Sequence, residues 1–143
     1  MDITDKDILI KLQEEGRISM TELGKAVSMS QPAVTERVRR LEERGIIDYY
    51  RAVLDPQKVN KKTTAFLLFH TKDCEKFIRF CKETPDVIEL HRISGQYNYL
   101  IKIVTKSMAS LESIIDMSGI HGDSTTLIVL SSPFSLKNIV PDF

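Results

Sequence analysis

The sequence lacks any apolar run close to the 18 residues that a membrane-spanning helix needs. It also lacks a positively charged start, because Asp2, Asp5 and Asp7 occupy the region where a secretory signal would carry basic residues. These absences predict a cytoplasmic protein with no membrane partner. A chain of 143 residues, 42% of them hydrophobic, suits one domain of average size or two small ones.

Cysteine is scarce, since the chain contains two. Cys74 and Cys81 share an i, i+3, i+4, i+7 stripe with Phe77 and Ile78, so both thiols are predicted to be small core residues of a helix. This usage fits a helix better than a disulfide framework and agrees with a reducing compartment. The alternative is a metal site in which the thiols gather with the three histidines, His70, His91 and His121. We predict no metal and no other cofactor.

Net charge is absent as well, because 20 Lys+Arg residues balance 20 Asp+Glu residues. Domains that bind nucleic acid on their own are usually basic. Residues 1–62 hold twelve basic and eleven acidic residues, which leaves a charge of only +1. A single module with this charge is expected to bind DNA weakly, since phosphate neutralisation supplies much of the affinity.

Patterns typical of catalysis are missing. The chain shows no paired carboxylates, no nucleophile and base at a recognisable spacing, and no glycine-rich phosphate loop. The sequence therefore predicts a protein that is not an enzyme.

The chain does contain two helix start signals close together. Ser19 followed by Glu22 predicts a capping box, and Ser30 followed by Pro32 predicts a second helix start. Gly45 ends the second helix. Two capped helices with apolar stripes, joined by a very short turn, are typical of a DNA-binding helix-turn-helix.

The exposed face of the second helix supplies candidate DNA contacts. Gln31, Thr35 and Arg39 are predicted to contact bases or adjacent phosphates, because glutamine pairs with adenine, threonine touches the thymine methyl and arginine reads guanine. The other candidates are Ser30 and three arginines that would grip phosphates, Arg37, Arg40 and Arg44. The alternative is a solvated face, or ion pairs with the glutamates Glu36, Glu42 and Glu43.

A polar stretch in the first half of the chain predicts a domain boundary. Residues 1–55 form the helix-turn-helix domain, which begins with a helix over 4–15 capped by Thr4 and ends in an extended segment or wing over 46–54. Residues 56–62 form a linker, and the rest of the chain, 63–143, forms an oligomerisation and effector domain.

The C-terminal domain alternates strand and helix in the order β-α-β-β-α-β. Strands are predicted over 64–71, 87–93, 97–104 and 125–131, with helices that start at the caps Asp73 and Ser107. This order is that of a ferredoxin-like fold, an antiparallel four-stranded sheet with two helices on one face. With the three-helix winged-type domain before it, the chain is predicted to be an α+β protein.

The predicted strands are apolar on both faces. In the first strand, Ala65, Leu67 and Phe69 alternate with Phe66 and Leu68. Two helices cover only one face, so the second face is predicted to be buried by another copy of the chain in a dimer. The alternative is that the N-terminal helices cover it.

These features occur in an order that resembles the Lrp/AsnC, or feast–famine, transcription regulators across essentially the whole chain. The matching motifs are Asp5-x-x-Ile8-Leu9, Arg17-Ile18, Glu22-Leu23, Ser30 with Thr35, Arg37-Val38-x-x-Leu41-Glu42-x-x-Gly45-Ile46-Ile47, Ala52-x-Leu54-Asp55-Pro56, Gly95-x-Tyr97-Asn98-Tyr99 and Thr125-Thr126. The resemblance implies double-stranded DNA as a partner and homodimers that assemble further, commonly into octamers. It also implies small effectors, often amino acids, bound between dimers.

The resemblance places the effector loop at five consecutive residues, Gly95, Gln96, Tyr97, Asn98 and Tyr99, with Thr125 and Thr126 as further polar candidates. Asn98 stands where the family usually has aspartate, so the loop offers an α-ammonium group a neutral amide in place of a full negative charge. The alternative is a simple turn with two aromatic sheet residues.

The sequence as a whole predicts a transcription regulator that binds DNA as a dimer or higher oligomer and responds to an amino acid or another small effector. In a dimer or higher oligomer, linked helix-turn-helix modules would bind DNA together, and this avidity would compensate for the weak affinity of each module. The alternative is an architectural protein that wraps or bends DNA with relaxed sequence preference and no effector response.

Overall fold

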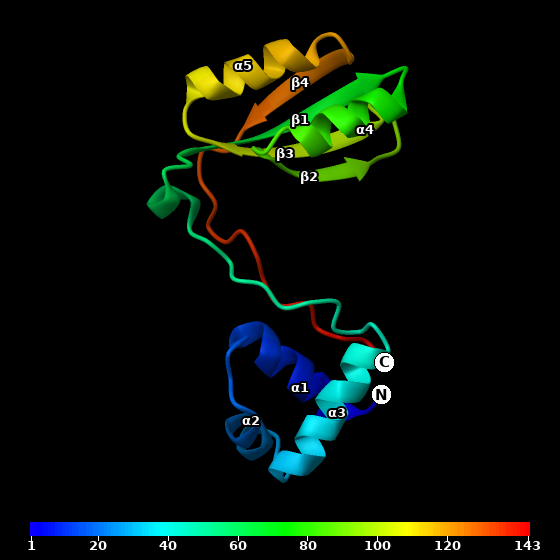
Figure 1. Cartoon of the computed structure of the whole chain (residues 1–143), viewed down its shortest axis with the longest axis vertical. Helices are drawn as coiled ribbons and strands as arrows, with labels where there is room; N and C mark the ends of the chain where they lie inside the picture. Colours follow the sequence, from blue (N-terminus) through cyan, green and yellow to red (C-terminus); the bar gives the residue numbers. More distant parts are fainter. The chain divides into compact units, whose positions relative to one another are not determined.

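The computed structural model describes residues 1–143, which divide into two compact units (Figure 1). The helical unit comprises Met1–Val53 together with Phe134–Phe143, and the sheet unit comprises Leu54–Pro133. The division differs from the predicted one in its last residues, which group with the helices. The Gln13 side chain explains this grouping, because its amide donates to the Ile139 carbonyl oxygen at 2.9 Å and accepts from the Ile139 N–H at 2.8 Å.

The helical unit contains α1 (Ile3–Glu14), α2 (Met20–Ala26) and α3 (Gln31–Glu43). The predicted starts of α2 and α3 are confirmed, since the hydroxyl oxygen of Ser19 accepts from the Glu22 N–H and that of Ser30 accepts from the Ala33 N–H. The Ser19 capping box is only half formed. The Glu22 carboxylate accepts from the Ser19 hydroxyl and does not bond to a backbone N–H.

The predicted cap of α1 at Thr4 is wrong, because Asp2 caps this helix two residues earlier. The Asp2 carboxylate accepts from the Asp5 N–H at 2.9 Å, and the Asp5 carboxylate accepts from the Asp2 N–H at 3.1 Å. This reciprocal arrangement satisfies two free N–H groups of the first turn, where Thr4 could satisfy one.

The core of the helical unit is aliphatic, and its buried members are Ile8, Leu9, Leu12, Leu23, Val34, Val38 and Leu41. Gly24 is buried beside the turn between α2 and α3, where its carbonyl accepts from the Met29 N–H at 2.8 Å. A Cβ atom on Gly24 would lie 2.7 Å from the Met29 carbonyl oxygen. A residue without a side chain therefore permits the tight turn. Gly45 ends α3 as predicted, with φ at +67°.

The segment predicted to be extended or to form a wing, residues 46–54, belongs to no helix or strand. Its Tyr50 hydroxyl donates to the Glu42 carboxylate of α3 at 2.8 Å. Partial burial, followed by this carboxylate, raises the pKa of the Tyr50 phenol to about 12.

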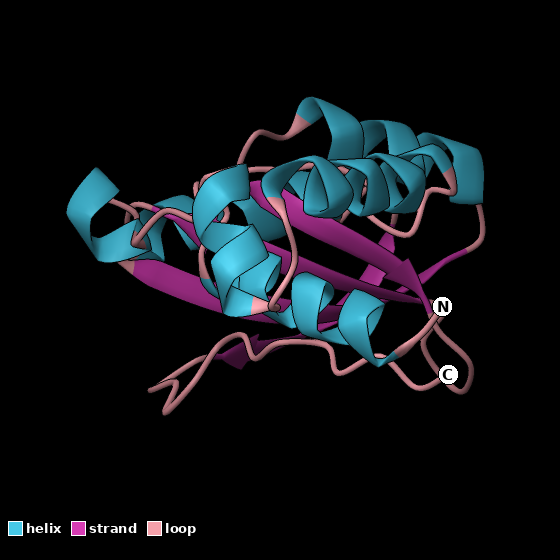
Figure 2. Ribbon diagram, turned by 90° about the horizontal axis from the view of Figure 1, so that it is seen from below, coloured by secondary structure: helices cyan, strands magenta, loops and turns pink.

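The sheet unit has the predicted order β1 (Thr63–Thr71), α4 (Cys74–Glu83), β2 (Val87–Arg92), β3 (Tyr99–Thr105), α5 (Met108–Ser118) and β4 (Gly122–Ile128). The strands form one antiparallel sheet in the order β2-β3-β1-β4 (Figure 1). Figure 2 shows the strands in magenta and the helices in cyan. The caps Asp73 and Ser107 are confirmed.

The prediction placed the last strand too far along the chain, at 125–131. Gly122 starts β4 beside Thr71 with φ at +155°, and a Cβ there would lie 2.0 Å from the His70 carbonyl oxygen. Only glycine permits this close approach, which lets a polar segment complete the sheet edge.

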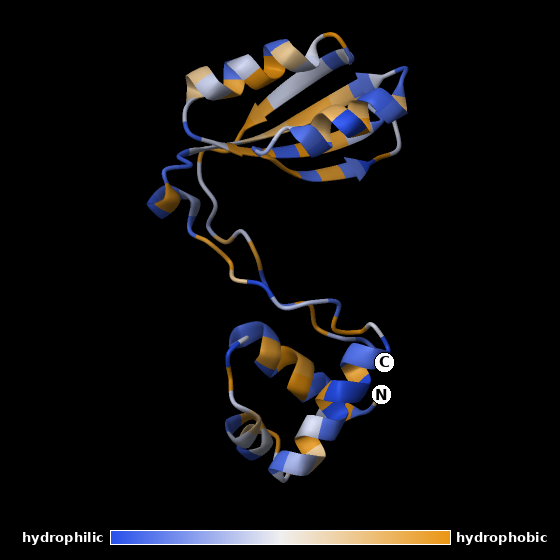
Figure 3. Cartoon of the chain, in the orientation of Figure 1, coloured by the Kyte–Doolittle hydropathy of each residue, from blue (hydrophilic) through white to orange (hydrophobic).

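The two faces of the sheet differ as predicted. Ala65, Leu67 and Phe69 are fully buried in the core formed with α4 and α5, whereas Phe66 and Leu68 are half-buried on the opposite face. The hydropathy colouring of Figure 3 shows that hydrophobic residues are frequent along β1. The core is aromatic, with Phe69 stacked on Phe77 of α4 at a centroid distance of 4.1 Å.

Both cysteines lie on α4 as free thiols, with Cys81 buried and Cys74 half-buried, as the core interpretation predicts. Burial raises the pKa of the Cys81 thiol to about 11. The structure brings together no group of three or more His, Cys, Asp or Glu side chains that could hold a metal. None of its helices combines the length and apolar character required to cross a bilayer.

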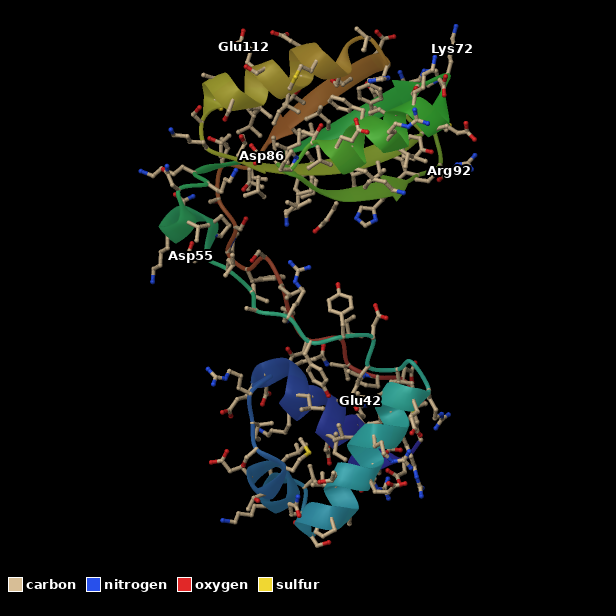
Figure 4. All side chains as sticks on the ribbon, viewed as in Figure 1. Glu42, Asp55, Lys72, Asp86, Arg92 and Glu112 are labelled. Carbon is tan, nitrogen blue, oxygen red and sulfur yellow. The ribbon has the colours of Figure 1, made fainter.

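The predicted linker is ordered as part of the sheet unit. Pro56–Val59 forms a short 3₁₀ helix capped by Asp55. The Lys61 ammonium then pairs with Asp86, whose second oxygen accepts from the Thr105 hydroxyl at 2.6 Å. Figure 4 labels Asp86. Burial raises the pKa of Asp86, but the hydrogen bonds from Lys61 and Thr105 outweigh it and hold that pKa below its usual value.

Candidate nucleic-acid interface and ligand loop

The first turn of α3 exposes two polar side chains that the sequence predicts to contact DNA. Gln31 and Thr35 are both exposed, and the Thr35 hydroxyl donates to the Gln31 carbonyl at 2.7 Å. The Gln31 amide lies 3.4 Å from the same hydroxyl. The amide donors and acceptors and the Thr35 methyl therefore remain available to base edges.

The next turns of α3 carry Arg39 and Arg40, which both pair with Glu36. Arg39 donates to the two Glu36 carboxylate oxygens at 2.9 and 2.7 Å, and Arg40 donates to one of them at 3.0 Å. Arg39 also pairs with Glu43. Hydrogen bonds from Arg39 and then from Arg40 lower the pKa of Glu36 to about 2, and the same pairing raises the pKa of Arg39.

Arg37 turns away from the exposed face and toward α1. Its guanidinium lies 2.7 Å from the Asp2 carboxylate and 2.8 Å from that of Asp5. These hydrogen bonds raise the pKa of Arg37, while the one from Arg37 lowers that of Asp2. Arg37 therefore links α3 to the N-terminal end of α1. To contact a phosphate, Arg37 would have to break its bonds with Asp2 and Asp5.

Arg44 follows the last turn of α3 and is exposed without an ion pair, which leaves it able to bind a phosphate. The candidates predicted from the sequence as DNA contacts lie on α3 and at its two caps. Five further cationic side chains of the helical unit also lack a carboxylate partner, namely Lys6, Arg17, Lys25, Arg51 and Lys137.

The loop between β2 and β3 places Asn98 against the end of β1. The Asn98 carbonyl oxygen accepts from the Thr71 N–H at 3.0 Å, and its amide donates to the Thr71 carbonyl at 2.8 Å. The side chain thus replaces the pair of bonds that a strand backbone would make. An aspartate at this position could accept but could not donate.

The loop and β4 bring together Tyr97 and Thr125, whose hydroxyl oxygens lie 2.6 Å apart at an exposed position. Tyr99 is buried in the core against Phe77 instead. Thr126 lies opposite the buried Leu67, on the face that the helices cover. Gly95 and Gln96 are exposed, with Gly95 at a φ of +109°.

Comparison with known proteins matches both parts of the chain. Residues 1–48 fit a winged helix-turn-helix DNA-binding model, and residues 64–139 fit the Lrp/AsnC ligand binding domain model. The chain belongs to the Lrp/AsnC family of transcription regulators. It is 50% identical over 132 residues to an uncharacterized HTH-type transcriptional regulator, YezC of Bacillus subtilis, which covers 92% of this chain and 95% of the relative.

Other members of the Lrp/AsnC family align over nearly the whole chain. The leucine-responsive regulatory protein of Escherichia coli is 31% identical, over 91% of this chain and 85% of the relative. The solved structure of Bacillus subtilis LrpC has a TM-score of 0.91 at 30% identity and covers 95% of this chain and 99% of that one. The L-Met complex of a Neisseria meningitidis transcriptional regulator has a TM-score of 0.92 at 27% identity and covers 97% of this chain and 96% of that one.

Proposed function

We propose that this regulator binds double-stranded DNA selectively through α3, as a dimer that assembles toward an octamer. The observation that carries the proposal is the capped, exposed first turn of α3, where Gln31 and Thr35 present hydrogen-bonding groups outward. The N-terminal residues of such a helix are those that reach base edges in the major groove. We infer that Ser30 and Arg44 lie close to phosphates at the two ends of the helix.

Dimer formation through the uncovered face of the sheet is supported by the side chains on that face. Its half-buried or exposed apolar members are Phe66, Leu68, Leu100, Val104 and Leu127. At its centre Lys102 lies 5.8 Å above the Phe66 ring and 3.7 Å from Glu89. A largely apolar face with one charged pair at its centre is typical of an association surface.

The test combines oligomeric state with footprinting. Sedimentation should give a dimer or larger assembly, and Leu68→Asp should yield monomers that protect DNA far more weakly, because paired modules lose their linkage. We expect the wild-type chain to protect half-sites phased by about one helical turn. Stable monomers with one short protected site contradict the proposal, and protection without sequence selectivity indicates an architectural protein instead.

We further infer that a small effector binds at the Tyr97 and Thr125 hydroxyl pair. These groups are exposed and belong to the segment matched by the ligand binding domain model. A relative that is described as an L-Met complex supports an amino acid as the class of effector. With the Asn98 amide already bonded to Thr71, recognition would depend on hydroxyl groups and not on a carboxylate.

Thermal unfolding in the presence of each amino acid tests this inference. A ligand at about one hundred times its Kd stabilises the native state by about 2.7 kcal/mol, so it raises Tm measurably. Tyr97→Phe should remove that rise while leaving the Tm of the free protein nearly unchanged. A panel of amino acids that leaves the Tm of the wild-type chain unaltered argues against effector control.

A further inference from the structure

Glu36 pairs with both arginines on the exposed face of α3, and Glu43 pairs with one of them, Arg39, as well. The Glu36 carboxylate accepts two hydrogen bonds from Arg39 and one from Arg40. The third arginine within the helix, Arg37, is bonded to Asp2 and Asp5 of the helical unit. No arginine within α3 is therefore free to bind phosphate without first giving up a carboxylate.

Glu36 differs from the other glutamates of α3 in its place on the helix. It lies one turn after Pro32 and one turn before Arg39, in the middle of the face that a major groove would receive. Its side chain is 43% exposed and that of Arg39 is 52% exposed, so water screens the pair and exchange with another anion is easy.

We propose that Glu36 is a specificity-determining residue. On DNA of arbitrary sequence it keeps Arg39 and Arg40 in ion pairs, so that they do not bind phosphates. At sites where a base donates a hydrogen bond to the Glu36 carboxylate, the two arginines are free to bind phosphates. This inference rests on the proposed DNA-binding function. Phosphate contacts carry no sequence information, whereas a carboxylate in the major groove accepts from the amino group of cytosine.

The physical basis is a competition between two anions. When a phosphate displaces Glu36 from the arginines, the freed carboxylate is left close to the negative duplex. On random DNA that repulsion persists, because no base donor meets the carboxylate. At a site where a cytosine amino group donates to the Glu36 carboxylate, this hydrogen bond offsets the repulsion. The contacts of Arg39 and Arg40 with phosphates then form at a lower cost in free energy.

The test compares Glu36→Gln with a matched control, Glu42→Gln. Both variants remove one negative charge from α3, but Glu42 accepts from the Tyr50 hydroxyl and bonds to no arginine. Affinity is measured against a random-sequence duplex and against the tightest duplex that the wild-type full chain selects from a random library. Each measurement is repeated over a salt series.

The Glu36→Gln variant should bind the random duplex about tenfold more tightly and show a steeper salt dependence, by about one to two phosphate contacts. Its preference for the selected duplex should fall by about tenfold, with loss of selection at a C·G pair. The Glu42→Gln variant should retain the wild-type preference within about twofold, because the Glu42 charge is bonded to no arginine and acts on both duplexes alike.

If Glu36→Gln and Glu42→Gln change the two affinities equally, the inference is overturned, because the effect is then one of overall charge. An unchanged preference of Glu36→Gln for the selected duplex also overturns it. Glu36→Asp provides a second check if Glu36→Gln folds poorly, because it keeps the charge but shortens the reach to the arginines. A wild-type chain that binds neither duplex refutes the proposed function itself, and that result is read from the wild-type measurements alone.

Discussion

The helical unit and the sheet unit are stabilised in different ways. The helical unit has seven buried hydrophobic side chains, all aliphatic, and ion pairs that include Arg37 with Asp2 and Asp5. The sheet unit has a core of ten buried residues in which the Phe77 ring contacts both Phe69 and Tyr99. The helical unit therefore depends on a smaller, aliphatic core with ion pairs at its surface, while the sheet unit has a larger core that contains aromatic rings.

The largest expected effect is that of Phe77→Ala. Phe77 is fully buried and contacts the rings of Phe69 and Tyr99, so its removal should destabilise the sheet unit by about 3 to 5 kcal/mol. Urea unfolding followed by circular dichroism should show a lower midpoint for the sheet unit, with the transition of the helical unit in place. A common shift of both transitions would break the comparison, because it shows that the units unfold as one.

Gly24→Ala is the corresponding change in the helical unit. The new Cβ would lie 2.7 Å from the Met29 carbonyl oxygen, so the turn before α3 must shift, at a cost of about 2 kcal/mol. The helical unit should melt earlier while the sheet unit is unaffected. Stabilisation, as expected for alanine in an open helix, would show instead that this turn yields readily.

Asp86→Asn should lower the free energy of unfolding by about 1 kcal/mol at neutral pH, because a neutral amide cannot form an ion pair with Lys61. The folded state lowers the pKa of Asp86, so its carboxylate contributes stability that is present above the unfolded value near 3.9 and lost as pH falls through the folded value. Unfolding free energies of wild type and variant should therefore differ at pH 7 and converge in acid. A difference that stays constant with pH would assign the effect to packing.

Arg37→Met is expected to have the smallest effect, a loss of about 1 kcal/mol or less, since the ion pairs with Asp2 and Asp5 are partly exposed. The apolar stem is retained, and the salt dependence of DNA binding should not change. A salt slope that falls by about one phosphate contact would instead support the sequence-based prediction that Arg37 grips phosphate.

Much of the fold could be predicted because its signals are local. The caps Ser30, Asp73 and Ser107 and the alternation along β1 lie within a few residues of the elements they define. The start of β4 was predicted wrongly, since it depends on where Gly122 meets Thr71 across the sheet. The α1 cap was also missed, because both Asp2 and Thr4 satisfy the local rule and only reciprocal bonding with Asp5 decides between them.

The details of the candidate sites depended on pairs distant in sequence. Nothing near Arg37 indicates that it faces residues more than thirty positions earlier. The substitution of Asn98 for aspartate was visible in the sequence, but its reason required the neighbouring end of β1. By contrast, Glu36 lies three and four residues from its arginines, and this spacing allowed ion pairing to be considered from the sequence.

The grouping of residues 134–143 with the helices bears on the order of synthesis. A ribosome completes α1, α2 and α3 first, yet Ile139, which bonds to Gln13, emerges only after all four strands. Domains generally fold in the order in which they leave the ribosome. The helical unit is the first to emerge, but its hydrogen bonds between Gln13 and Ile139 form only after the sheet unit has been synthesised. A nascent chain would therefore expose its DNA-reading helices before these bonds exist.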